Sequence, residues 1–103
     1  MSDVFEDVEI DEKIEQIIEE PNRFKVVFLN DDATPVEWVI ELLATVFKHS
    51  QLSAEHLTMT IHTEGSGIAG VYSFEIAETK TTEAVTASRA KGFPLQVKME
   101  EEN

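Results

Sequence analysis

The sequence predicts an α+β domain of two layers, in which three helices cover a three-stranded sheet in the order β-α-α-β-α-β. Short runs rich in β-branched and aromatic residues, at 24–29, 67–74 and 95–99, are typical of strands. Longer segments between them place apolar residues at helical spacing. The chain has 103 residues, 42% of them hydrophobic, which suits one domain with a core.

The first strand, residues 24–29, is only weakly alternating and is expected to be largely buried. It stops at Asn30-Asp31-Asp32, three residues that prefer turns. Thr34 then suits a helix N-cap, Pro35 the first helical position and Glu37 the capping-box position. A helix is therefore expected from Pro35 to about residue 48.

The remaining elements follow from caps and breakers. Ser53 is expected to cap a second helix that ends near the next glycines. The glycines of the second strand predict a bulge or a close backbone approach. A third helix is expected over residues 75–91 with Gly92 as its stop, followed by a strand over 95–99 in which apolar and polar residues alternate.

Acidic residues are concentrated at the start of the chain. The net charge is −13, and residues 1–22 contain nine acidic residues and one lysine. Residues 1–23 are therefore expected to form a flexible acidic arm before a folded domain at 24–103. Alternatively, four isoleucines at i, i+4, i+7 and i+8 predict a nascent helix that docks on a partner: Ile10, Ile14, Ile17 and Ile18.

Composition excludes several function classes. A chain with this much negative charge repels phosphate backbones. No nucleic-acid partner is therefore expected. The chain has no cysteine, so neither a disulfide nor a thiolate metal site is expected. It has no apolar run of about 20 residues, as a membrane span would need, and its start lacks the basic segment and apolar stretch of a signal peptide. We therefore expect a cytoplasmic protein with no membrane partner. The three histidines are spaced by seven and six residues, which does not match a zinc motif, and no cofactor or metal is expected.

The turn Asn30-Asp31-Asp32 has two interpretations. Asparagine and aspartate side chains commonly bond their own backbone in turns. Their oxygens also suit a cation. An ammonium group, which two or three acceptors satisfy, matches the turn better than a metal that needs six or more oxygens.

Five segments together resemble the ClpS family, whose members are adaptors that deliver N-degron substrates to a Clp AAA+ unfoldase. They are residues 29–39, His62, residues 70–72, residues 77–80 and residues 93–95. The resemblance covers about residues 24–99. It implies a monomeric adaptor and not an enzyme, with a ClpA- or ClpC-type unfoldase and N-degron peptides as partners.

The resemblance also implies roles for individual residues. The substrate α-ammonium would be held by Asn30, Asp31, Asp32 and His62. An apolar pocket for the first side chain would be lined by Thr34, Val36, Val39, Thr58, Ile61 and Leu95. The unfoldase would dock on a surface that includes Glu75 and Lys80, and it would engage the N-terminal arm during handover.

The chain departs from the common pattern of this family at three positions. Val36 and Thr58 stand where many members carry Met, and Ala33 replaces a Tyr. Both pocket changes remove volume, so we expect a roomier pocket that admits Ile as well as Leu and aromatic residues, and the Thr58 hydroxyl needs a partner. Two other classes compete with the adaptor: a general peptide or ribosome-associated binding module of the related L7/L12-like fold, and a small hydrolase using Asp32 and His62.

Overall fold

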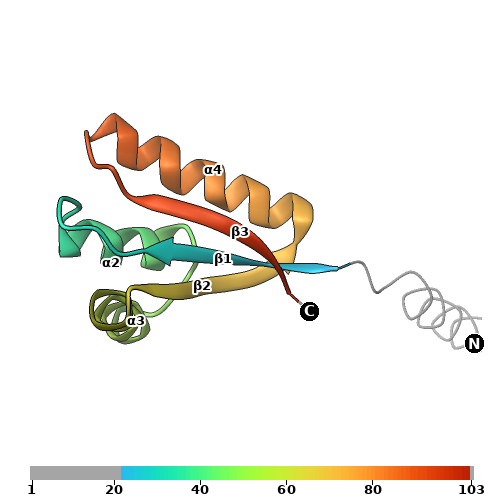
Figure 1. The fold of residues 1–103 in the computed structure, drawn as a ribbon, viewed down its shortest axis with the longest axis horizontal. Coiled ribbons are helices and arrows are strands. Elements are labelled where there is room, and N and C mark those ends of the chain that lie inside the picture. Colours follow the sequence, from blue (N-terminus) through green and yellow to red (C-terminus); the bar gives the residue numbers. More distant parts are fainter. Residues whose placement is uncertain (1–21, 103) are drawn as a thin grey trace, which may run out of the picture.

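The computed structural model describes residues 22–102, and the predicted acidic arm, apart from its last two residues, lies outside them. Figure 1 shows the elements in chain order. They are β1 (Arg23–Leu29), α2 (Val36–Thr45), α3 (Gln51–Glu64), β2 (Ser66–Ser73), α4 (Phe74–Ala90) and β3 (Gln96–Glu102). The predicted fold class and element order are confirmed. Over these residues no helix is both long enough and apolar enough to cross a membrane.

The sheet has the order β2-β1-β3, and both pairings are antiparallel, so the first strand in the chain is the central one. Val26 and Phe28 of β1 point to the helical side and are fully buried. They belong to one hydrophobic core to which all three helices contribute, with Leu43 of α2, Ile61 of α3 and residues of α4. All three helices therefore cover the same face of the sheet.

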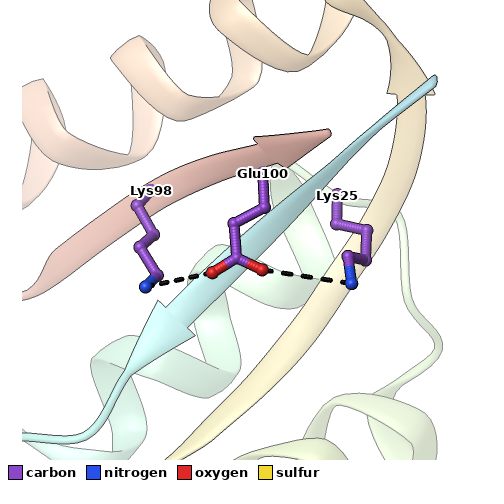
Figure 2. Close-up of polar contacts among 3 residues, drawn as sticks. All are labelled: Lys25, Lys98 and Glu100. Carbon is purple, nitrogen blue, oxygen red and sulfur yellow. Dashed lines mark ion pairs between the residues drawn. The ribbon is translucent and has the colours of Figure 1, made fainter. Parts of the chain in front are cut away.

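The opposite face of the sheet carries a cluster of charged side chains, Lys25, Lys98 and Glu100 (Figure 2). Glu100 of β3 lies beside Lys98 and across from Lys25, with carboxylate-to-ammonium distances of 3.0 and 3.9 Å. The hydrogen bond and the charge of Lys98 lower the pKa of the Glu100 carboxyl from its ordinary value. Exposed pairs of this kind contribute little stability.

The predicted irregularity in β2 is a bulge. Val26 pairs with Gly70 and Val27 with Ile68, so Ala69 has no partner on β1. A side chain at Gly70 would run into the ring of Tyr72. The glycine thus leaves space for that aromatic ring, which agrees with the expected close approach.

The helix boundaries correct two predicted caps. Thr34 does not cap α2; Pro35 holds that position without a side-chain bond, and the helix ends at Thr45, earlier than expected. Ser50, not Ser53, caps α3, because its hydroxyl accepts the Ser53 N–H at 3.1 Å. The helix ends at Gly65, whose φ of 95° is in the left-handed region that glycine favours.

The bounds of the last helix and the last strand also differ from the predicted ranges by one to three residues. Helix α4 stops at Ala90, and Gly92 follows it with a φ of 81°, as the sequence predicts. Strand β3 starts at Gln96 and continues through three glutamates to Glu102. Those glutamates pair with the start of β1, so this acidic end of the chain belongs to the sheet.

Candidate functional site

A cavity of about 160 Å³ lies where β1 ends and the chain turns toward α2. Segments far apart in the sequence meet there: the turn after β1, the start of α2, the second half of α3 and the residue before β3. The cavity is lined by Leu29, Asn30, Asp31, Asp32, Thr34, Val36, Val39, Thr58, Ile61, His62 and Leu95. All ten residues that the sequence places in the binding site are in this set.

The polar wall starts at Asn30, whose N–H donates to the Gly65 carbonyl at 2.9 Å and so ties the turn to the end of α3. Asp31 is occupied within the turn. Its Oδ1 accepts the N–H groups of Ala33 and Thr34 at 2.8 and 2.7 Å, and its Oδ2 accepts the Thr34 hydroxyl at 2.9 Å. Asp31 therefore shapes the turn through local bonds, which is the alternative interpretation of this motif.

The side chains of Asn30, Asp32 and His62 make no hydrogen bond within the part of the chain that the structure describes, and all three are exposed. Each offers an acceptor: an amide oxygen, a carboxylate, and a ring nitrogen when the imidazole is neutral. Residues 22–102 contain no group of three His, Asp or Glu side chains that would hold a metal ion. The arrangement suits a compact cationic donor such as an ammonium group.

The apolar wall is formed by Val39, Ile61 and Leu95, which are 7%, 4% and 1% exposed. Thr58 lies among them and donates its hydroxyl to the Ala54 carbonyl at 2.7 Å. This bond supplies the partner that the threonine requires, so the wall carries no unpaired donor there. Val36 is about half exposed and forms part of the rim.

Leu29 also lines the cavity and was missed from the sequence. The sequence predicts only that it ends a buried strand. Its position immediately before the turn was the available signal, because a residue at a strand end borders whatever the following turn encloses. The structure leaves it partly buried.

Glu75 and Lys80, the predicted docking residues, lie on α4 and not at the cavity. Lys80 is engaged within the protein: its Nζ donates to the Val46 carbonyl at 2.7 Å and lies 5.9 and 5.5 Å from the ring centroids of Phe47 and Tyr72. Glu75 is exposed in the first turn of the helix. Lys80 thus fastens α4 to the chain after α2.

Comparison with known proteins gives a consistent result. The model of the ClpS family, ATP-dependent Clp protease adaptor protein ClpS, matches residues 19–98. The Clp protease adapter ClpS of Burkholderia mallei (strain SAVP1) is 42% identical over 96 residues, covering 93% of this chain and 92% of the relative. That of Burkholderia thailandensis is 43% identical over 90 residues, covering 87% and 86%.

A solved structure is similar in fold as well. Agrobacterium tumefaciens ClpS2 bound to L-phenylalaninamide superposes with a TM-score of 0.78 and 41% sequence identity. The match covers 81% of this chain and 100% of the other. L-phenylalaninamide carries a free α-amino group and one aromatic side chain.

Proposed function

Because the chain belongs to the ClpS family of Clp protease adaptors, we propose that its cavity binds the free N-terminus of proteins destined for degradation. The protein is an adaptor that recognises N-degrons, substrates with a free bulky hydrophobic first residue, and delivers them to a Clp AAA+ unfoldase. The family supports this function over a ribosome-associated module of L7/L12-like fold. It acts by binding and is not itself an enzyme.

Two functional halves of one cavity carry the proposal. Asn30, Asp32 and His62 present acceptors that have no hydrogen-bond partner among residues 22–102, and they adjoin an apolar wall. The substrate ammonium donates to these three groups, and the charge on Asp32 strengthens its bond. Asp31 contributes indirectly by holding the turn in shape.

The first side chain of the substrate enters the apolar half. Burying a Leu or Phe side chain contributes roughly 1.5–3 kcal/mol relative to leaving it in water. The ligand of the Agrobacterium relative supports this assignment, since it has the two groups that the two halves would hold. Selectivity for large apolar first residues follows, because a small side chain leaves the wall in contact with water.

Peptides that differ only at residue one test this function by fluorescence anisotropy. We expect peptides starting with Phe or Leu to bind at least about tenfold more tightly than one starting with Ala, from the burial energy of the side chain. Equal affinities for the three peptides would contradict the proposed side-chain pocket.

The small side chain of Val36 at the rim predicts that the pocket accepts a β-branched first residue. Val36 and Thr58 are smaller than Met, so we expect a peptide starting with Ile to bind within about tenfold of its Leu counterpart. Val36→Met should reduce binding of the Ile peptide more than that of the Leu peptide, because the longer side chain narrows the entrance for a β-branched group. Ile binding no better than Ala in the unmodified protein would refute the roomier pocket.

The unfoldase is proposed to dock on α4, at the exposed Glu75 and the neighbouring Ile76. These two side chains line a groove of about 420 Å³ together with Lys80. Ile76 is 50% exposed, and an exposed apolar residue with polar neighbours matches the apolar core and polar rim of a protein interface. The partner would be of the ClpA or ClpC type, acting on a monomeric adaptor in the cytoplasm, with residues 1–23 as the segment that it engages.

A further inference from the structure

We propose that a groove beside the cavity, between α2 and α3, binds the second side chain of the substrate and favours lysine or arginine there. The inference deepens the proposed function and depends on it, since the bound first residue determines where the second one lies. It concerns a part of the surface to which the first residue does not extend.

The groove has a volume of about 350 Å³ and adjoins the cavity. It is lined by Val36, Ile40, Glu55, Thr58, Met59 and His62. Three of these, Val36, Thr58 and His62, line the cavity as well. A peptide whose ammonium lies against His62 and whose first side chain passes Val36 therefore has the groove directly beside its next residue.

The near part of the groove is apolar and open to solvent. Met59 is 60% exposed and Val36 is 52% exposed, and Ile40 lines the groove with them. A cluster of exposed large apolar side chains marks a surface to which another apolar group can bind. The aliphatic stem of a long side chain would cover them.

The far part of the groove is acidic. A second hollow of about 510 Å³ continues along α2 and α3, and it shares Ile40 and Glu55 with the first. Glu37 and Glu41 also line it, and neither hollow is lined by Lys or Arg. The ion pairs within residues 22–102 involve Glu100 alone among the carboxylates.

Glu55 is the carboxylate common to both hollows, and it is held in place. Its Oε2 accepts the Gln51 side-chain N–H at 2.8 Å, one turn earlier on α3, which leaves Oε1 for a ligand. A side chain with an apolar stem and a terminal cation, as in lysine or arginine, matches a groove that is apolar in its near part and acidic in its far part. A second residue with a carboxylate would face Glu55 and be repelled.

Free peptides of sequence Phe-Lys, Phe-Ala and Phe-Glu, otherwise identical, test the inference by anisotropy at low salt. We expect Phe-Lys to bind about twofold to fivefold more tightly than Phe-Ala, as for an exposed ion pair, and Phe-Glu to bind more weakly than Phe-Ala. Glu55→Gln should remove the lysine advantage and leave Phe-Ala unchanged. The matched control is Glu64→Gln, an exposed glutamate on the same helix that lines neither hollow.

Equal binding of the three peptides, or a lysine advantage that survives Glu55→Gln, would overturn the inference. Met59→Ala gives an independent readout. It should weaken the binding of a Phe-norleucine peptide, which has the apolar stem without the charge. If instead Phe-Ala itself fails to bind better than its acetylated form, the proposed ammonium site has failed and not the groove alone.

Discussion

Acetylating the N-terminus of a Phe-starting peptide is expected to reduce its affinity by about 100-fold or more. Acetylation removes the positive charge and two of the three ammonium donors, and hydrogen bonds to charged groups contribute about 1.5–3 kcal/mol each. Asn30, Asp32 and His62 would then face a neutral amide with a single N–H. Anisotropy titrations of the free and acetylated peptides measure the loss. Equal affinities would contradict the ammonium site.

The neighbouring aspartates provide a matched pair for the same experiment. Asp32→Ala should reduce the affinity for the free peptide by about 10-fold to 100-fold. It should leave the free energy of unfolding nearly unchanged, because Asp32 is exposed and has no hydrogen-bond partner among residues 22–102. Asp31→Ala should lower the free energy of unfolding, since it removes three hydrogen bonds of the turn. Denaturant titration separates the two effects. The same loss of stability in both variants would refute the division of roles.

Removing residues 1–21 is expected to abolish delivered degradation and to leave peptide affinity unchanged. The cavity is lined by residues between Leu29 and Leu95, so the deletion removes none of its walls. Delivery requires a segment that the unfoldase can engage, and the acidic arm is the proposed one. Degradation of a Phe-starting reporter protein by the complete Clp protease measures delivery, and anisotropy measures peptide affinity.

Glu75→Ala is the control for that deletion. It keeps the arm but changes the proposed docking surface, so it should weaken binding of the adaptor to the unfoldase and reduce degradation at low adaptor concentration only. The arm deletion should not recover at any concentration. Loss of peptide binding on deletion, or degradation that persists without the arm, would contradict the proposed role of residues 1–23.

Local sequence signals predicted which elements form, but they misplaced some of their ends. Ser50 and Ser53 are both acceptable caps, and only the hydroxyl of Ser50 accepts a helical N–H. Leu52, between them, is 76% exposed, so no apolar periodicity marks the first turn of α3. Thr34 lies one residue before the N-cap position, which Pro35 occupies, and its hydroxyl donates to Asp31 within the turn. The glutamates at 100–102 form a strand because β1 offers them backbone partners.

The members of the site could be named from the sequence only through the family resemblance. Spacing alone does not bring residue 30, residue 62 and residue 95 together, since that requires the antiparallel sheet and the packing of α3 against β2. The resemblance could not assign Asp31 its bonds to Ala33 and Thr34, because a turn aspartate and a ligand aspartate look alike in sequence. The groove at Glu55 and Met59 was missed for a similar reason, as both belong to an exposed face of α3 without a distinctive pattern.

The central position of β1 has a mechanical consequence under the proposal that the unfoldase engages the N-terminal arm. Force applied to the residues before Arg23 acts along the axis of a strand that is hydrogen-bonded on both sides, from Arg23 to Leu29. Those bonds run perpendicular to the strand, so the pull loads both ladders in shear at once instead of peeling them bond by bond. Forced unfolding is governed by the unfolding rate, and we expect loading of both ladders in shear to lower that rate. An edge strand at this position would unzip, so we expect the central position of β1 to make the domain more resistant to a pull on its N-terminal side.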